Sequence, residues 1–573
     1  MTTCEDRPFD LTPEARRRLG WLTLVLALLF SLTGLTGHDP WKQDEAYSFG
    51  LVLNMVETGD WVVPRLANDP FMEKPPVYYW TAAALVPWLD GTLPAHDAAR
   101  LATGFYLLLT LSLAAWLGTV LWGAGAGSPA VLLTLGTLVV VQHGHYLITD
   151  SALMAGMALG TLGLALCRQR WWLGGLLLGT GAGLAFLAKG LLGPGILGVT
   201  ALALLAIPAW RSRAYWRALL IAALAAAPWV LIWPIGLYLR DPALFELWFW
   251  DNNFGRYLGG VDLGPPADAD FWLRTFPWVT FPAAPLAFWA CWVQRRRLRS
   301  DPALVAVLLL AIIGWAVLLV AHTARDLYAL PLIVPLAAVA AGGVTQLPLW
   351  FGRASFWCSA LLFGLLALLL WGLWLFGTVT GTAPDWPVIA RNLPLVHDFS
   401  RSGVVLGGAL VVTLGWGLLL WRIRPPRRAA PLAWPAGVVL LWCLLVWLHF
   451  PWIDQAKSYR AVMLDLKAAL PAQFNCVADL VEPQSLRLRE SERGLLHYFA
   501  GVKIQHAASP EQTDCDLLLL EVQRRDHREG VSLGADWVPL WQGQRAADQR
   551  DRFQLFQRRA SAAAPVPASA AGL

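Results

Sequence analysis

The sequence predicts a helical protein that crosses a membrane many times and ends in a small α/β domain. Composition is the first observation: 57% of the residues are hydrophobic, 14% are charged, and the mean hydropathy is +0.51. Soluble domains carry roughly 25% charged residues. The second observation is a series of long apolar segments between residues 20 and 450. The third is a change after Trp452, where the chain becomes polar and contains short β-like runs.

The apolar segments predict about thirteen transmembrane helices, because about 20 apolar residues are needed to cross the hydrocarbon core. They are residues 20–36, 96–122, 129–147, 151–167, 172–188, 190–208, 217–238, 271–293, 302–321, 326–346, 356–378, 403–421 and 433–450. The first follows three arginines and has the pattern of a signal peptide. No small-residue cleavage site follows it and many further spans do, so we expect a retained helix.

Lysine and arginine in the short loops predict the orientation, because these residues are enriched on the cytoplasmic side. With thirteen alternating spans, the arginine-rich loops all fall on one side: 16–18, 168–170, 211–217, 295–299, 353 and 422–428. Residues 1–19 then form a cytoplasmic tail, and residues 20–450 form the transmembrane domain. The loops 37–95 and 240–270 and a domain spanning 451–559 lie outside. Since the arginines sit in short loops between apolar runs, no nucleic-acid partner is expected.

The external loops are expected to contain helices that lie in the plane of the membrane interface. Between Glu45 and Thr58 apolar residues recur at helical spacing, and Gly59 is placed to cap the helix. Val77–Leu89 is a second segment of this kind. Loop 240–270 is expected to hold a third.

The C-terminal domain is expected to combine one helix with four strands. The helix is Tyr459–Leu470, and the strands are Cys476–Val481, Asp516–Val522, Trp537–Gln542 and Phe553–Gln557. Cys476 and Cys515 each precede or begin a β-like run. If those strands are parallel neighbours, the two residues come close enough for a disulfide, which persists in an external compartment. Two buried free thiols are the alternative. Residues 560–573 are rich in Ala and Pro and are expected to be disordered.

Eight charged residues form a candidate site, because the predicted topology places them all at external ends of spans or in external loops. They are Asp44, Glu45, Glu73, Lys74, Asp150, Lys189, Arg256 and Arg325. A charge near hydrocarbon is costly and is a functional candidate by default. Structural roles also fit: a helix dipole for the first acid pair, a surface ion pair for Glu73 and Lys74, an N-cap for Asp150, and snorkelling for Lys189 or Arg325.

The cluster suits lipid-linked chemistry. Cations at an external membrane face suit a lipid phosphate, and a carboxylate there suits a base or an amine ligand. The sequence contains no P-loop, no GxGxxG after a strand and no HExxH, so nucleotide chemistry and zinc proteolysis are poorly supported.

The motifs of the first external loop resemble a known family. DEAYSFGLVLNMVETGDWVVPRL and FMEKPPVYYW are similar to the corresponding loop of the bacterial aminoarabinose transferases and the related protein O-mannosyltransferases. The GLAFLAKG and RDLYALP runs also resemble later motifs of that family, so that the similarity covers roughly residues 20 to 350. The resemblance implies a GT-C fold. It also implies an inverting glycosyltransferase of the bacterial inner membrane, with its active site facing the periplasm.

The resemblance assigns roles to particular residues. Asp44 would sit at the donor sugar and the acceptor, with Glu45 and Asp150 as further catalytic acids. The carrier phosphate would be bound by Lys74, Lys189, Arg325 and Arg256, and the substrate by Glu73, Tyr47 and Tyr328. No cofactor is expected to be required. No secure metal site is visible, and a divalent cation stays open.

The resemblance implies a polyprenyl-phosphate-linked sugar donor but does not determine the sugar or the acceptor. The donor would be a sugar on a polyprenyl phosphate, and for the aminoarabinose branch the carrier is undecaprenyl phosphate and the acceptor a lipid A phosphate. Transfer to Ser or Thr of a protein is the alternative within the enzyme class. A lipid-linked sugar flippase or transporter is the alternative outside it. Against a transporter stand the lack of an internal repeat and the placement of the charges at one face rather than at the midplane.

Overall fold

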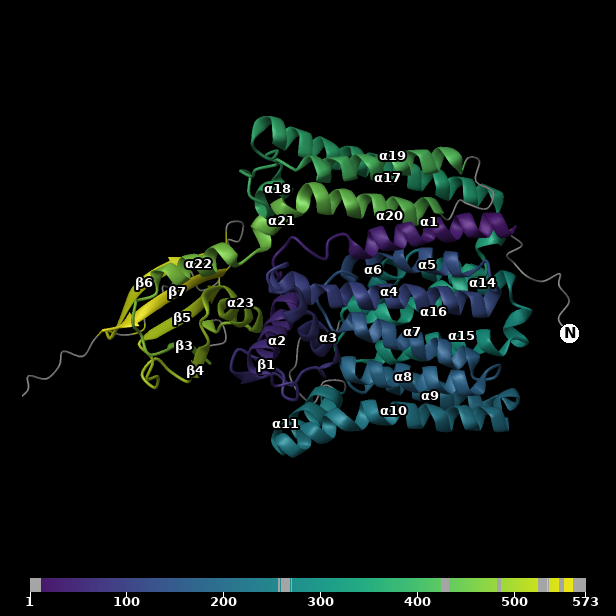
Figure 1. Ribbon diagram of the computed structural model, residues 1–573, viewed down its shortest axis with the longest axis horizontal. Coiled ribbons are helices and arrows are strands. Elements are labelled where there is room, and N and C mark those ends of the chain that lie inside the picture. Colours follow the sequence, from purple (N-terminus) through teal and green to yellow (C-terminus); the bar gives the residue numbers. More distant parts are fainter. Residues whose placement is uncertain are drawn as a thin grey trace, which may run out of the picture.

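A bundle of roughly parallel and antiparallel helices makes up most of the molecule, and a β-sheet lies at one end of it (Figure 1). We call this end of the bundle the sheet end. The computed structural model describes residues 12–255, 258, 268, 270–423, 432–481, 486–523, 533, 535–545 and 551–559. The predicted disordered tail 560–573 and part of loop 240–270 lie outside the described residues.

All thirteen predicted apolar segments contain helix. In chain order they correspond to α1 (Pro13–Leu32), α4 (Ala95–Trp122), α5 (Gly127–Leu135) with α6 (Leu138–His143), α7 (Asp150–Leu166), α8 (Trp171–Lys189), α9 (Leu192–Ala203), α10 (Arg213–Arg240), α13 (Phe271–Val279) with α14 (Ala283–Val293), α15 (Pro302–Val320), η7 (Asp326–Leu332) with α16 (Ile333–Ala341), α17 (Leu349–Thr380), α19 (Gly403–Arg422), and α20 (Ala433–Leu444) with η10 (Leu445–His449). Short elements between them are η3 (Leu204–Ala206), η4 (Pro208–Trp210), α11 (Pro242–Glu246), η5 (Leu247–Gly255), η6 (Arg297–Arg299), η8 (Val344–Gln346), α18 (Pro387–Asn392) and α21 (Phe450–Lys457).

The helices differ in how completely they cross a bilayer. Among the described residues, seven helices are long and apolar enough to span a membrane on their own, or eight if the pair α13 and α14, bent by 81°, is one span. The remaining predicted spans are shorter or broken. In η7, Pro331 lies within the helical segment, where its ring removes a backbone donor.

Glycines allow α7 and α8 to pack backbone to backbone. A Cβ atom on Gly163 of α7 would lie 2.3 Å from the backbone nitrogen of Leu178 on α8, and one on Gly181 of α8 would lie 2.3 Å from that of Gly160. The two helices form an antiparallel hairpin. The start of α7, at Asp150, therefore lies beside the end of α8, at Lys189.

Helix α2 (Asp44–Thr58) confirms the helix predicted in the first external loop, and Gly59 caps it with a φ of 66°. Its surroundings differ from those expected, because the sequence analysis predicted a helix lying in the plane of the membrane interface. α2 is buried between the bundle and α23 (Glu490–Ala500), a helix of the C-terminal region. A Cβ on Gly50 would lie 3.0 Å from the Cα of Gly494, so the two backbones touch. The apolar spacing of α2 could not reveal this second partner.

The rest of the first external loop is short elements. β1 (Arg65–Leu66) and β2 (Asp69–Pro70) form an antiparallel hairpin. The second predicted segment forms α3 (Val77–Leu85) and η2 (Pro87–Leu89).

The C-terminal region is a five-stranded mixed sheet with the order β4-β3-β5-β7-β6. β3 (Val477–Leu480), β5 (Leu517–Gln523), β6 (Trp537–Gly543) and β7 (Asp551–Arg558) confirm the predicted strands, and α22 (Arg460–Ala469) confirms the helix. β4 (Ile504–Ala507) was not predicted. β3 is parallel to both β4 and β5, and β7 is antiparallel to β5 and β6. The boundaries of a separate domain at 451–559 stay a prediction.

The disulfide predicted from the two strand starts is present. Cys476 and Cys515 are bridged, with their Cα atoms 4.7 Å apart. The parallel pairing of β3 with β5 brings them together.

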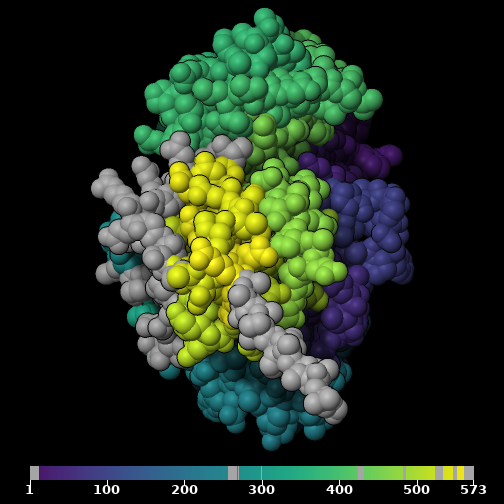
Figure 2. Space-filling view, turned by 90° about the vertical axis from the view of Figure 1, so that its left-hand side faces the viewer, coloured from purple at the N-terminus to yellow at the C-terminus, as the bar shows by residue number. Residues whose placement is uncertain are grey.

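The C-terminal sheet covers the centre of the sheet end of the bundle (Figure 2). Figure 2 views this end directly, with the green helices of residues 349–422 along its top and the teal α10 and α11 region along its bottom. Helix α2 of the first external loop therefore lies between the bundle and the C-terminal region.

Candidate active site

A cavity of about 340 Å³ gathers most of the predicted charged residues. Its polar part is lined by Asp44, Glu73, Lys74, Asp150, Lys189, Asn252, Asn253, Thr323, Arg325 and Tyr328. Its apolar part is lined by Leu191, Leu192, Gly195, Ile196, Val199, Phe254, Val317, Leu318, Ala321 and Leu327. The cavity thus joins three cations and three carboxylates to a hydrocarbon-like surface.

Asp44 opens α2 and is held by Arg325 from another part of the chain and by Tyr47 of α2 itself. Arg325, just before η7, donates to it from both terminal nitrogens, at 2.8 and 3.4 Å. The Tyr47 hydroxyl, one turn along α2, donates to Asp44 Oδ1 at 2.9 Å. Lys74 Nζ in turn donates to the Tyr47 hydroxyl and lies 3.9 Å from Glu73. Residues more than 280 positions apart in sequence thus meet at one carboxylate.

The second cluster lies where α7 begins and α8 ends. Lys189 Nζ donates to Asp150 Oδ1, and Asp150 is almost completely buried. The same ammonium lies 4.3 Å from the centre of the Tyr328 ring, a cation–π distance. Lys189 keeps 15% of its side chain exposed and lines the cavity, whereas the Asp150 side chain keeps 2%.

The electrostatic balance keeps Asp44 ionised. Burial acts to raise the pKa of Asp44, but the nearby Lys74 and Arg325 and the hydrogen bonds from Arg325 and Tyr47 outweigh it, so that the pKa lies below its usual value of 3.8. A carboxylate of this kind is a weak base. It is suited to orienting a polar group or stabilising positive charge rather than to removing a proton from an alcohol.

The structure does not bring all predicted site residues together. Tyr47 touches the site through Asp44 and Lys74 but is itself buried. Glu45 points away from the cavity and accepts from Arg100 at 3.2 Å and from the Leu147 backbone at 3.0 Å. Glu45 therefore does not line the cavity. Arg256 lies outside the described residues.

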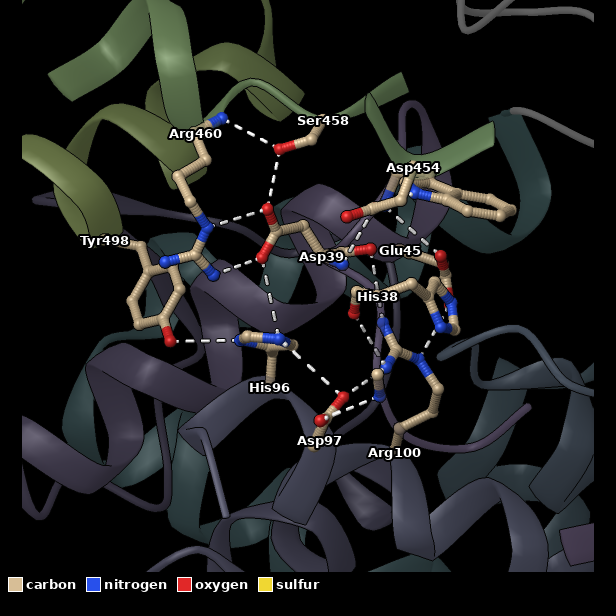
Figure 3. A network of polar contacts seen from close by, with 12 residues as sticks. His38, Asp39, Glu45, His96, Asp97, Arg100, Asp454, Ser458, Arg460 and Tyr498 are labelled. Carbon is tan, nitrogen blue, oxygen red and sulfur yellow. Dashed lines mark hydrogen bonds and ion pairs between the residues drawn. The ribbon is translucent and has the colours of Figure 1, made fainter. Parts of the chain in front are cut away.

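A buried polar network behind α2 was missed by the sequence analysis (Figure 3). Arg100 of α4 is fully buried and donates to Glu45, to Asp97 at 2.9 Å and to three carbonyl oxygens of the segment Leu35 to Asp39. Asp39 accepts from Arg460 of α22, which ties this segment to the C-terminal region. Arg100 interrupts an apolar span, and that signal could have identified it.

Metal binding has no visible site in the part of the chain that the structure describes, where no group of three or more His, Cys, Asp or Glu side chains is arranged to hold an ion. The expectation that no cofactor is required stays a prediction.

Comparisons with known proteins support one family. No family model matches the chain. It is 28% identical over 479 residues to an undecaprenyl phosphate-α-4-amino-4-deoxy-L-arabinose arabinosyl transferase of Edwardsiella ictaluri, covering 79% of this chain and 80% of the relative. The transferase of the same name from Serratia proteamaculans is 28% identical over 462 residues, covering 75% and 77%. The chain is a relative of the bacterial aminoarabinose transferases.

Solved structures agree on the fold. The crystal structure of ArnT from Cupriavidus metallidurans in the apo state superposes with a TM-score of 0.67 at 16% identity, covering 94% of this chain and 98% of that one. The same protein bound to undecaprenyl phosphate gives 0.64 at 17% identity, with the same coverage. The predicted GT-C fold is therefore confirmed, and this relative of the aminoarabinose transferases is a multi-pass membrane glycosyltransferase.

Proposed function

We propose that this glycosyltransferase moves an amino sugar of the 4-amino-4-deoxy-L-arabinose type from undecaprenyl phosphate to a phosphate group of lipid A. The reaction takes place at the periplasmic face of a bacterial inner membrane. The observation that carries the proposal is the cavity itself, whose lining combines the cations Lys74, Lys189 and Arg325 with apolar side chains. A lipid phosphate would use both features, because its phosphate can bind the cations and its hydrocarbon chain can contact the apolar side chains.

The cations would bind the carrier phosphate. Lysine and arginine form charge-assisted hydrogen bonds with phosphate oxygens, and these are stronger than neutral ones. In the cavity each cation is within reach of a carboxylate or a phenol, so an incoming phosphate would share it with those groups. The apolar lining between α9 and α15 suits the first isoprene units of the carrier.

The reaction would then need no strong base. An oxygen of the ionised lipid A phosphate attacks the anomeric carbon and forms the new C–O bond. The bond between that carbon and the carrier oxygen breaks, and undecaprenyl phosphate leaves with the electron pair. Lys74, Lys189 and Arg325 stabilise the charge of this leaving group.

Asp44 would stabilise the positive charge that develops on the sugar, or pair with its amine. Its lowered pKa suits this role. A serine or threonine acceptor would instead require a base to take the hydroxyl proton, and that favours the lipid phosphate. The sugar amine also fits the acidic side chains Glu73 and Asp150 that line the cavity.

Mass spectrometry of lipid A tests the proposal. The gene is expressed in a strain that makes the undecaprenyl phosphate donor but lacks its own transferase. Lipid A that gains the mass of an aminopentose on its phosphates is the expected result. Unmodified lipid A, with the protein present in the membrane and the donor accumulating, would contradict it.

A further inference from the structure

The position of the Lys189 ammonium depends on the backbone conformation at the C-terminal end of α8. Lys189 is the last residue of the helix, and the chain leaves it through Gly190, whose φ is 76°. L-residues with a side chain rarely adopt that conformation. A change in this turn would therefore move Lys189 relative to Asp150 and Tyr328.

Asn253 of η5 fills this turn from outside. Its Oδ1 accepts a hydrogen bond from the Leu191 backbone N–H at 3.0 Å. A Cβ atom on Gly190 would lie only 2.2 Å from the same oxygen. The amide therefore occupies the space that glycine leaves open, and Asn253 and Lys189 both line the cavity.

The Asn253 side chain is itself held by Trp248, a buried residue of the same element η5. Its Nδ2 donates to the Trp248 carbonyl at 2.8 Å, so both ends of the amide are used. Trp248 is 1% exposed and packs on Phe186 and Trp233, with ring centres 5.8 and 4.7 Å away. Trp233 donates from its indole nitrogen to the Val62 carbonyl at 2.8 Å, which ties η5 and α10 to the first external loop. A π-helix such as η5 is often found at functional sites.

We infer that Asn253 is a positioning residue that orients Lys189 toward the carrier phosphate. It acts through the turn Gly190 to Leu191 rather than by touching the substrate. The inference rests on the proposed function, since it takes Lys189 as a phosphate ligand. It adds that Asn253, a residue of η5, contributes to the affinity for the carrier.

A double-mutant cycle tests the inference, with undecaprenyl phosphate as the probe and the full-length protein in detergent. The variants are Asn253→Ala, Lys189→Met and the two combined, and the dissociation constant is measured for each. We expect Lys189→Met to weaken binding by roughly tenfold and Asn253→Ala by roughly three- to tenfold. In the Lys189→Met background, Asn253→Ala should change the constant by less than about twofold, because residues that act through each other are not additive.

A second variant perturbs the same turn without changing Asn253, and it tests whether the effect on binding arises from the turn. Gly190→Ala leaves the Asn253 side chain unchanged but places a methyl group where its oxygen lies. It should weaken binding of undecaprenyl phosphate in the same way, and its effect should also vanish in the Lys189→Met background.

The outcomes separate the inference from the proposed function. If Lys189→Met leaves binding unchanged, the phosphate assignment fails and the inference fails with it. If Lys189→Met weakens binding but Asn253→Ala has no effect, or adds its full effect in the double variant, the inference alone is wrong. If the two substitutions change the dissociation constant additively and Asn253→Ala also lowers the melting temperature, Asn253 contributes to general stability instead.

Discussion

Asp44 is the residue at which two of the three cations of the cavity meet, one directly and one through a tyrosine. Arg325 reaches it from the start of η7, Tyr47 from the next turn of α2, and Lys74 through the Tyr47 hydroxyl. The carboxylate is 16% exposed. It is therefore ionised, oriented on one side by its partners and open to the cavity on the other.

Replacing Asp44 by asparagine tests its electrostatic role. The amide keeps the size of the side chain and removes the negative charge, so we expect transfer to fall by about 10²–10³-fold. The measurement is the transfer rate of purified protein at saturating donor. The melting temperature should change little, and an unaltered rate would remove Asp44 from the mechanism.

Lys74 is predicted to bind the carrier phosphate. Methionine keeps the apolar stem and removes the charge. A charge-assisted hydrogen bond contributes about 1.5–3 kcal/mol, so affinity for undecaprenyl phosphate should fall roughly tenfold or more.

The control is Lys467→Met on α22, where the side chain is exposed. Binding of undecaprenyl phosphate should be unchanged in that variant. If Lys74→Met lowered only the turnover and left binding intact, the assignment of Lys74 to the phosphate would be wrong.

At the scale of elements, the α7 and α8 hairpin aligns the second half of the site. The glycines that bring the two backbones together set the distance between the first residue of α7 and the last residue of α8. The Gly-rich sequence around Lys189 is thus explained by packing, and the placement of Lys189 beside Asp150 follows from it.

Gly163→Ala tests this packing. Its new methyl group would lie 2.3 Å from the Leu178 nitrogen, so the helices must separate. Overpacking of this kind typically costs about 1–3 kcal/mol. We expect a lower melting temperature and weaker binding of undecaprenyl phosphate.

Gly198→Ala on α9 is the matched control, because nothing lies within 4 Å of a Cβ built there. Alanine is the better helix former, so this change should be neutral or slightly stabilising. Equal effects of the two substitutions would contradict the packing argument.

Local sequence signals predicted most elements but not their partners. α2, its cap at Gly59 and four strands followed from spacing and composition alone. α23 and the short strand β4 were missed: the amphipathic pattern of α23 was present but not used, and β4 is only four residues long. The burial of α2 could not be predicted either, since it depends on contacts with α23, more than 400 residues away.

The candidate site was predictable because membrane proteins rarely place charges near hydrocarbon. Asp44, Lys74, Asp150, Lys189 and Arg325 were singled out for that reason, and they line one cavity. Glu45 satisfied the same rule, yet it faces Arg100 on the other side of α2. Neighbours on a helix point about 100° apart, so an acid pair cannot by itself tell which member faces the site.

At the scale of the whole molecule, α22, α23 and β4 of the C-terminal region hold the first external loop in place through charged contacts. Arg460 pairs with Asp39, Arg493 with Asp69, and His506 with both Asp69 and Asp479. Asp39 lies five residues before Asp44, the first residue of α2, and Asp69 lies in β2, which pairs with the strand β1 beside α2. Docking of the sheet and the geometry of the site are therefore linked.

His506 makes this docking depend on pH. Hydrogen bonds to Asp479 and Asp69 raise the pKa of His506 from 6.5 to about 9. A group with a raised pKa stabilises the folded protein fully below its unfolded pKa, and the contribution is lost as the pH rises through the folded value. The melting temperature should therefore fall between about pH 6.5 and pH 9.

His506→Gln should remove this pH dependence, which thermal unfolding in detergent would detect. The variant should be less stable than the wild type at pH 6 and close to it at pH 9.5. If the melting temperature depends on pH in the same way in both proteins, His506 does not couple the sheet to the loop.

Sugar transfer by the purified protein is the most direct test that this chain is an aminoarabinose transferase. Protein reconstituted in liposomes is given undecaprenyl phosphate-linked aminoarabinose and lipid A, with Asp44→Asn as the control. We expect aminoarabinose-modified lipid A and an equal amount of free undecaprenyl phosphate, with almost none of either product from the variant. Donor that crosses the bilayer without being cleaved, or donor that stays intact beside unmodified lipid A, would contradict it.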